Sequence, residues 1–202
     1  HSINSGRPDG FDIESGEVKY NIDWVDVDSD GDLEILVCKF HCEIWTPSRF
    51  PTIVWSWEGD STAITSSAIS DFDEDGDLDL AIGTQKNIYI FSNYTKNEIL
   101  YDEPTFILDN KNTRFLHWAD IDGNGWLDLL TGNDGKDQIF GNFNGDLSLV
   151  WKSDSSSKTN FILTADIDLD GDLDIIGSDL DSVFIINNEK DNSASYYQAL
   201  EM

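Results

Sequence analysis

Four short segments of the chain concentrate carboxylates at a spacing that suits a hard metal ion. They begin at Asp26, Asp71, Asp120 and Asp166, and each follows the pattern Asp-x-Asp-x-Asp/Asn-Gly-x-Leu-Asp/Glu. Side chains at loop positions 1, 3 and 5 turn toward one centre when the backbone curls, and the glycine at position 6 permits the positive φ angle that the curl needs. Calcium takes roughly six to eight oxygen ligands from carboxylates, carbonyls and water. The sequence therefore predicts about four calcium ions per chain, one in each segment.

The expected ligands occupy positions 1, 3, 5, 7 and 9 of each segment. Position 7 is Trp126 in the third segment, and because its side chain offers no oxygen, position 7 is expected to contribute its backbone carbonyl. Position 9 is acidic in every copy and is expected to close the site. The third segment has Asn124 at position 5, so it is predicted to bind calcium most weakly. The expected ligand residues are Asp26, Asp28, Asp30, Asp32, Glu34, Asp71, Asp73, Asp75, Asp77, Asp79, Asp120, Asp122, Asn124, Trp126, Asp128, Asp166, Asp168, Asp170, Asp172 and Asp174.

These segments contribute to an extreme overall charge. Asp and Glu number 40 against 12 Lys and Arg, which gives a formal net charge of −28. Such a chain repels nucleic acid and anionic lipid, and no apolar stretch approaches the roughly 18 residues of a membrane-spanning helix. Because 39% of the residues are hydrophobic, disorder does not explain the composition. We therefore expect a folded protein that neither binds nucleic acid nor inserts into a membrane.

The segments recur at intervals of 45, 49 and 46 residues, and strand-like runs surround each of them. One run precedes each segment and three follow it, which predicts an all-β fold: a β-propeller of four four-stranded blades with the calcium loop between the first and second strands. The chain is interpreted as a single domain, residues 1–202, with repeats at about 17–60, 61–110, 111–156 and 157–202.

A closed ring of four blades is expected, because an open arc would expose strand edges and apolar faces. Closure would bring Trp24–Val27 close to Phe161–Ile167 in the fourth repeat. The alternatives are a truncated larger propeller and an arc completed by a neighbouring subunit.

An EF-hand begins with a similar loop but requires a glutamate at position 12 and flanking helices. Position 12 lies in a strand-like run in every copy and carries no carboxylate, which excludes the EF-hand. The residues at this position are Val37, Ile82, Thr131 and Gly177.

The repeated loops resemble the FG-GAP and VCBS-type repeats of integrin α-chain propellers and related bacterial proteins. The resemblance extends from about Tyr20 to Ile186, with departures at Glu34 (position 9) and Asn124 (position 5). It implies ligands from the side chains of positions 1, 3, 5 and 9 and the carbonyl of position 7. It also implies extracellular binding of proteins or glycans.

The leading functional hypothesis is an extracellular or cell-surface propeller for recognition or adhesion, in which calcium is structural. The partner would be an unidentified protein or glycan ligand, with self-association as an option. The alternatives are a structural subunit of an extracellular filament or surface layer and a carbohydrate-active enzyme on a propeller scaffold. No catalytic residue is assigned, because no nucleophile elbow, zinc-protease motif or phosphate loop occurs, and we expect no enzymatic activity.

Three further features bear on the cell compartment and on binding. Cys38 and Cys42 favour a short disulfide over two free thiols, which agrees with an oxidising compartment. Asn93-Tyr94-Thr95 is either an N-glycosylation acceptor or an unmodified turn. Packing between blades is the expected role of most tryptophans, with Trp45 as a candidate for stacking on a sugar.

Overall fold

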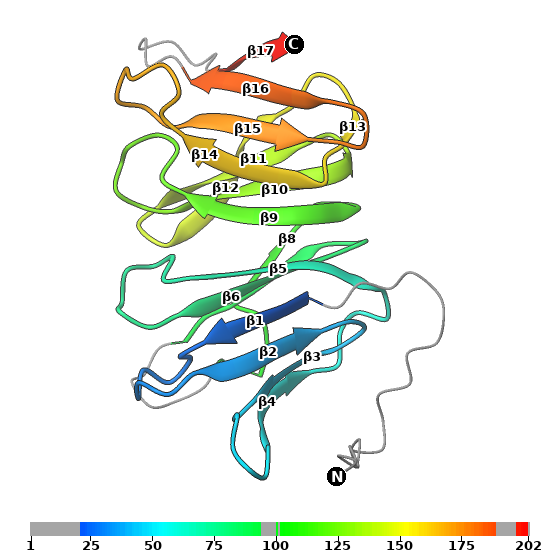
Figure 1. Ribbon diagram of the computed structural model, residues 1–202, viewed down its shortest axis with the longest axis vertical. Helices are drawn as coiled ribbons and strands as arrows, with labels where there is room; N and C mark the ends of the chain where they lie inside the picture. The colour runs from blue at the N-terminus through cyan, green and yellow to red at the C-terminus, as the bar shows by residue number, and fades with distance from the viewer. Residues whose placement is uncertain (1–20, 94–99, 101, 189–196, 202) are drawn as a thin grey trace, which may run out of the picture.

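The computed structural model shows four antiparallel sheets that stack face to face in a row (Figure 1). It describes residues 21–93, 100, 102–188 and 197–201, the last group by backbone alone. Each sheet corresponds to one repeat, and we call it a blade. Within each blade, successive strands are neighbours, which is the up-and-down order that hairpin connections produce. No described helix is long and apolar enough to cross a membrane.

The blades are formed by strands close to the expected runs. Blade 1 comprises β1 (Asn21–Val25), β2 (Glu34–Cys38), β3 (Cys42–Trp45) and β4 (Ile53–Trp57). Blade 2 comprises β5 (Ile64–Ser70), β6 (Asp79–Thr84), β7 (Ile88–Phe91) and β8 (Phe106–Leu108). Blade 3 comprises β9 (Thr113–Ala119), β10 (Asp128–Gly135), β11 (Gln138–Phe143) and β12 (Asp146–Lys152), and the short β13 (Ser157–Lys158) pairs with β10. Blade 4 comprises β14 (Phe161–Ala165), β15 (Asp174–Ser178), β16 (Val183–Asn188) and β17 (Tyr197–Glu201).

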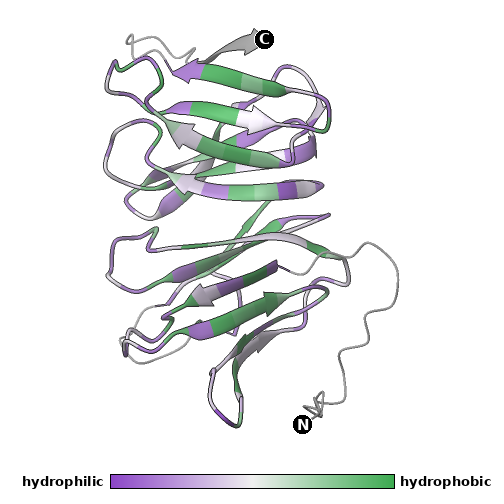
Figure 2. Cartoon of the chain, viewed as in Figure 1, coloured by the Kyte–Doolittle hydropathy of each residue, from purple (hydrophilic) through white to green (hydrophobic). Residues whose placement is uncertain are grey.

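Three apolar clusters hold the blades together, one at each junction. The first joins residues such as Leu36 and Trp55 of blade 1 to Phe91 of blade 2. The second joins blades 2 and 3, and the third joins blades 3 and 4. Hydrophobic residues lie mainly in the strands (Figure 2). A blade between two neighbours is covered on both faces, and all residues of β6 are accordingly buried. The continuous apolar runs of β6 and β10, the second strands of the two middle blades, therefore reflect burial on two sides.

The first strands of successive blades lie beside one another: β1 contacts β5, β5 contacts β9, and β9 contacts β14. The first strand of every blade thus lies on the same side of the row, as the innermost strands do in a propeller. The middle blades are thus held on both sides, whereas blades 1 and 4 each have one neighbour.

The expected closed ring is wrong. Blades 1 and 4 lie at opposite ends of the row (Figure 1), and Trp24–Val27 does not meet Phe161–Ile167. Because each blade stacks on the preceding one, four blades extend along the row without returning to the first. The outward faces consequently expose large apolar side chains, with Trp24 58% exposed in blade 1 and Ile167 43% exposed in blade 4.

Other expectations are confirmed or refined. Cys38 and Cys42 form a disulfide across the β2–β3 hairpin and are both fully buried. The four residues at loop position 12 all lie in second strands, as the rejection of an EF-hand requires. The fourth strand of blade 2, β8, is short and comprises only Phe106–Leu108. The pairing of β13 with β10 was not anticipated.

Candidate metal sites

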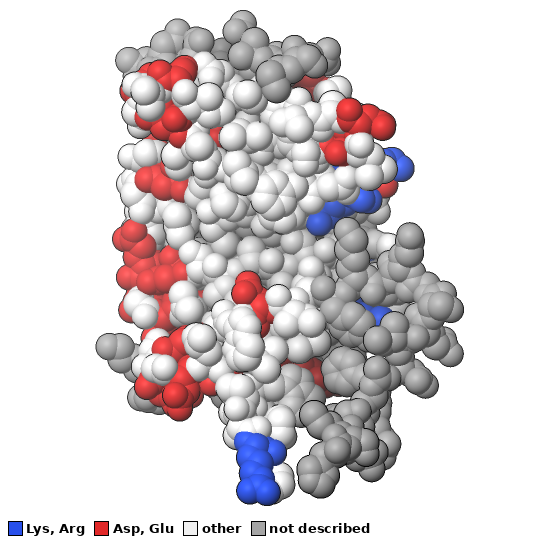
Figure 3. All heavy atoms as spheres, viewed as in Figure 1, with Lys and Arg blue, Asp and Glu red and all other residues white. Residues whose placement is uncertain are grey.

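The four acidic loops occupy the same place in every blade, between the first and second strands. The loop of blade 2, for example, leaves β5 after Ser70 and enters β6 at Asp79. All four loops lie on one edge of the molecule, where acidic side chains gather (Figure 3). The stacking of the blades therefore lines up the repeated motif along one side.

Three carboxylates converge in each loop. In every copy the side chains of positions 1, 3 and 9 place one oxygen each within 4.8 Å of the others. The four groups are Asp26, Asp28 and Glu34; Asp71, Asp73 and Asp79; Asp120, Asp122 and Asp128; and Asp166, Asp168 and Asp174. These twelve residues were all expected as ligands from the sequence.

Positions 5 and 7 stand outside these groups. The Asp75 carboxylate of position 5 accepts a hydrogen bond from the backbone N–H of Asp77 at 3.0 Å, and the other loops repeat this contact at 2.7–3.0 Å. Position 5 thus shapes the turn by fixing the backbone of position 7. Asn124 takes this role in the third loop, and its amide also donates to Asp122 at 3.1 Å.

Two positions in each loop adopt left-handed backbone. The position-6 glycines have φ between 94° and 97°, and a side-chain carbon added there would meet no atom within 4 Å, so backbone conformation alone demands glycine. Their N–H groups donate to the position-1 carboxylate at 2.9–3.1 Å. Position 4 also has a positive φ in every loop, which was not predicted from the sequence. The glycine at this position in the third copy, Gly123, could have indicated it. In the fourth copy the position is occupied by Leu169, with φ of 64°.

The position-9 carboxylate is buried in every loop. Asp79 accepts hydrogen bonds from the backbone N–H of Phe72 at 3.1 Å and of Asn93 at 2.9 Å. These hydrogen bonds lower the pKa of Asp79, but the desolvation caused by burial is the larger effect. Together with the charges of nearby carboxylates, burial raises the pKa of Asp79 to about 8. Burial likewise raises the pKa of Asp128 to about 6, and it raises the pKa of Glu34. A divalent cation would favour the ionised form of each of these groups.

Some oxygens in the loops have no protein partner. Asp26 Oδ1 and Asp73 Oδ1 are buried without a hydrogen bond to any described residue. A buried carboxylate oxygen is costly to leave unpaired. Both oxygens belong to residues of the three-carboxylate groups, so the donor set fits an oxygen-preferring cation such as calcium.

A repeated asparagine links each loop to the preceding blade, and sequence reasoning missed it. The side-chain amide N–H groups of Asn93, Asn142 and Asn188 donate to the carbonyls of Val27, Phe72 and Ile121, respectively. The distances are 2.8, 2.7 and 2.7 Å, and we call these residues the inter-blade asparagines. Each stands 22 residues after the first aspartate of its repeat, a regularity that could have revealed them.

Blade 1 breaks this pattern. In blade 2, Phe91 pairs with Leu80, and the inter-blade asparagine follows two residues later. In blade 1 the equivalent pair is Trp45 with Ile35, and the residue two positions after Trp45 is Pro47. Proline has neither a side-chain donor nor a backbone N–H. The described residues of blade 1 therefore lack the asparagine contact that each of the other three blades makes with its preceding neighbour.

The structure also bears on the glycosylation motif. The amide nitrogen of Asn93, where a glycan would be attached, is buried and bonded to Val27 of the neighbouring blade. This favours the unmodified alternative. Tyr94 and Thr95 lie outside the described residues.

Several tryptophans pack between blades, as expected. Trp118 of blade 3 stacks on Phe72 of the blade 2 loop, with ring centroids 5.6 Å apart. Trp55 packs edge-on against Phe91 at 5.1 Å. Trp45 is only partly exposed, and its indole N–H donates to Glu43 at 2.8 Å.

The sequence comparisons support the interpretation of the repeats. Residues 71–131 match a family described as an FG-GAP-like repeat. No curated protein sequence matches the chain. The matched segment begins at the first ligand position of the second loop and ends in the second strand of blade 3, so it contains two of the four candidate sites.

Solved structures share the fold at low sequence identity. The mercury-soaked crystal structure of BBS1N in complex with ARL6DN has a TM-score of 0.58 and 14% identity, covering 92% of this chain and 55% of that chain. The lead-soaked crystal of the same complex gives a TM-score of 0.54 and 15% identity, covering 82% of this chain and 52% of that chain. The chain thus spans about half the length of these β-propeller-like neighbours.

Proposed function

We propose that this FG-GAP-type repeat protein is a calcium-stabilised recognition module that acts outside the cell. The observation that carries the proposal is the convergence of three carboxylates in each of four equivalent loops. Within each group, the three ionised carboxylates repel one another strongly when no cation lies between them. One calcium ion per loop would offset that repulsion and hold the loop in its curled conformation.

Calcium suits these loops better than other common metals. Every member of the four groups is a carboxylate, with no histidine or cysteine, and hard oxygen donors favour calcium or magnesium over zinc. Magnesium demands near-ideal octahedral geometry and retains several waters, whereas calcium accepts irregular sets of protein oxygens. Backbone carbonyls and water would complete the coordination.

The proposed role of the ion is structural. In blade 2 the position-9 residue Asp79 accepts the backbone N–H of Asn93, whose side chain holds Val27 of blade 1. An ion bound by Asp79 would therefore be connected, through Asn93, to the junction between blades 1 and 2. Calcium would stabilise both its own loop and the stacking of neighbouring blades.

Recognition is supported by the family match and by the fold. The FG-GAP-like repeat and the propeller-like arrangement fit a recognition or adhesion role in general, and BBS1N, which has a similar fold, was crystallised with the partner ARL6DN. The Cys38–Cys42 disulfide supports an oxidising, extracellular location. We infer that the ligand is a protein or glycan, that nucleic acid is not a partner, and that the chain is not an enzyme.

Thermal unfolding with and without calcium tests the proposal. Each ion that binds only the folded state contributes about 2.7 kcal/mol at a hundredfold excess over its Kd. Chelation should therefore lower the melting temperature sharply, and calcium should restore it better than magnesium does. An unchanged melting temperature in excess chelator would refute structural calcium binding.

A structural subunit remains a second candidate because both end blades expose apolar side chains. Ile22 and Trp24 lie on the outward side of blade 1, while Leu163 and Ile167 lie exposed in blade 4. Exposed apolar patches of this kind commonly mark protein interfaces. Sedimentation velocity at increasing protein concentration separates the two candidates: calcium-dependent polymers would favour the subunit, and a persistent monomer would favour the recognition module.

A further inference from the structure

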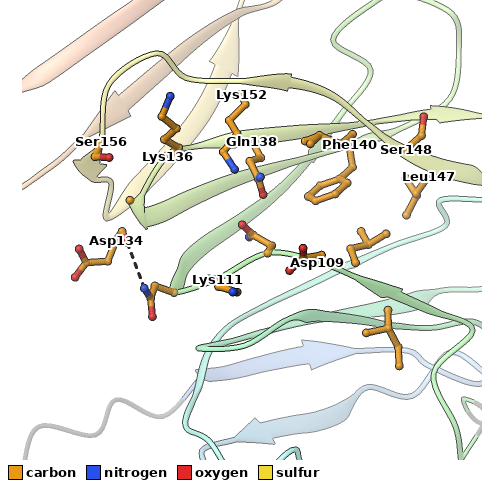
Figure 4. Close-up of a pocket in the computed structure, with 16 residues that line it drawn as sticks. Asp109, Lys111, Asp134, Lys136, Gln138, Phe140, Leu147, Ser148, Lys152 and Ser156 are labelled. Carbon is orange, nitrogen blue, oxygen red and sulfur yellow. Dashed lines mark hydrogen bonds between the residues drawn. The ribbon is translucent and has the colours of Figure 1, made fainter.

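A hollow of about 680 Å³ lies between blades 2 and 3, at the end of the blades away from the metal loops (Figure 4). The acidic loop of blade 3 connects the end of β9 to the start of β10. The hollow instead is lined by residues just before β9 and by the last residues of β10 and the turn that follows it. Its other walls come from β8 of blade 2 and from β11 and β12 of blade 3. We call it the blade 2–3 groove, and its volume falls within the range of small-ligand sites.

The groove gathers positive charge on a strongly negative chain. Lys111, Lys136 and Lys152 line it, which is three of the eight lysines and arginines that the structure describes. None of the three forms an ion pair within 4.0 Å of a described acidic group. Of the two acids in the lining, Asp134 is paired with Lys158 at 3.6 Å, which leaves Asp109 against three lysines. The groove thus carries a local excess of positive charge.

A buried amide in the wall of the groove lacks a partner. Gln138 is 5% exposed, and its side-chain Oε1 is buried without a hydrogen bond to any described residue. Its backbone is fixed by hydrogen bonds with the Thr131 hydroxyl, which accepts from the Gln138 N–H and donates to its carbonyl. The side chain ends in the groove, between Lys152 and the segment that carries Lys111 (Figure 4). An unpaired buried acceptor is destabilising, so a donor from a bound molecule would be stabilising here.

The remaining lining combines neutral polar groups with apolar walls. Asn110 is held by hydrogen bonds that its amide donates to Thr113 and Asn133, while Leu149 and Ile107 are exposed apolar side chains. Amides and serine hydroxyls both donate and accept hydrogen bonds, as do the hydroxyl groups of sugars. Three cations are too few to bind the closely spaced phosphates of a nucleic acid. They suit a ligand whose negative charges are farther apart and are separated by hydroxyl groups.

We propose that the blade 2–3 groove binds an anionic oligosaccharide of the hexuronate class. The sugar carboxylates would lie against the ammonium groups of Lys111, Lys136 and Lys152, and a ring hydroxyl would donate to Gln138 Oε1. This inference rests on the proposed recognition function and specifies its ligand and its site.

The test is isothermal titration of the intact, calcium-loaded chain with tetragalacturonate. The neutral galactose tetrasaccharide of the same linkage and hexaglutamate serve as comparison ligands, all at one buffered free-calcium concentration. The acidic sugar should bind, and the neutral sugar should bind at least tenfold more weakly because it cannot make the charge-assisted contacts with the lysines. Hexaglutamate should also bind at least tenfold more weakly, because it carries the charges but no ring hydroxyl to donate to Gln138 Oε1. Absence of tetragalacturonate binding would overturn the inference, and so would equal or tighter binding of hexaglutamate.

Variants locate the site. The double change Lys136→Gln with Lys152→Gln and the single change Gln138→Leu should each weaken tetragalacturonate binding at least about tenfold. Arg49→Gln, an exposed residue between β3 and β4 of blade 1, should leave it unchanged. Equal binding by the lysine double variant and the wild type would overturn the assignment.

The thermal shift on calcium addition provides the independent readout. It should be the same in the wild type, the lysine double variant and Gln138→Leu, which also confirms that the variants fold. A normal calcium shift without uronate binding contradicts the ligand inference alone, whereas a missing calcium shift contradicts the proposed function itself.

Discussion

The side-chain amide of Asn142 donates a hydrogen bond of 2.7 Å to the backbone carbonyl of Phe72, across the junction between blades 3 and 2. The backbone N–H of the same Asn142 donates to Asp128, the position-9 residue of its own loop, also at 2.7 Å. One residue therefore joins a candidate metal site to the packing of the next blade. Asn93 and Asn188 repeat both contacts at the other two junctions.

Replacing Asn142 with alanine should destabilise the fold strongly. The change removes donors to the carbonyls of Phe72 and Leu127 and an acceptor for the N–H of Gly145, all within 3.0 Å. Because buried groups left unpaired cost about 1–3 kcal/mol, the free energy of unfolding should fall by about 3 kcal/mol. Urea denaturation measures this, with the exposed Gln85→Ala as the control. Equal midpoints for the two variants would show that the inter-blade contact contributes little.

Asp73→Asn should act in opposite directions with and without calcium. Desolvation and the charges of Asp75 and Asp71 raise the pKa of Asp73, so neutralising it should leave the calcium-free protein as stable as the wild type or slightly more stable. The same change removes a ligand from the second loop and should reduce the stabilisation by saturating calcium. Differential scanning calorimetry in both conditions tests this, with the exposed Asp154→Asn as control. A full calcium shift in Asp73→Asn would argue against a site in that loop.

Asn124→Asp should strengthen calcium binding at the third loop. That loop has three carboxylates at positions 1, 3, 5 and 9, and the change gives it four, as in the other loops. The substitution also removes the amide that donates to Asp122, so the calcium-free variant should be less stable. Calcium titration of wild type and variant compares the weakest binding step. An unchanged or weaker step would contradict the charge-count argument.

Calcium stabilisation should increase with pH between about 5 and about 8. In the calcium-free fold, burial raises the pKa of Asp79 from 3.8 to about 8. The folded state then binds a proton more tightly than the unfolded state, so this group stabilises the calcium-free fold at low pH and that contribution is lost as the pH rises through about 8. Calcium takes the place of the proton, and Asp128 acts in the same way with a pKa of about 6.

Melting temperatures with saturating calcium and with chelator, measured at pH 5 and pH 8, give the two shifts. The shift at pH 8 should be the larger. Titrations in buffers of different ionisation enthalpy should also show proton release on calcium binding near pH 7. Equal shifts at both pH values would mean that these carboxylates are ionised before calcium binds.

The repeat itself made most of the fold predictable. Asp-rich turns at near-even spacing marked every first-to-second strand connection, and apolar runs such as Leu78–Gly83 marked the strands beside them. The convergence of positions 1, 3 and 9 was also predictable, because a curled loop brings alternate side chains together. Local sequence suffices for these features because each depends on residues within a few positions of one another.

Ring closure and the inter-blade contacts were not predictable in the same way. Closure depends on how one blade stacks on the next, which involves residues as far apart as Asn142 and Phe72. The role of Asn93 was hidden because the same residue begins a glycosylation motif. The groove between blades 2 and 3 likewise brings together segments whose separate sequences show no common pattern.

The calcium content of the folded protein tests the central claim most directly. The chain should be dialysed against metal-free buffer, reloaded with calcium, freed of unbound ion and subjected to elemental analysis. Four equivalent loops with converging carboxylates predict about four calcium ions per chain. A ratio of one or zero would contradict the account.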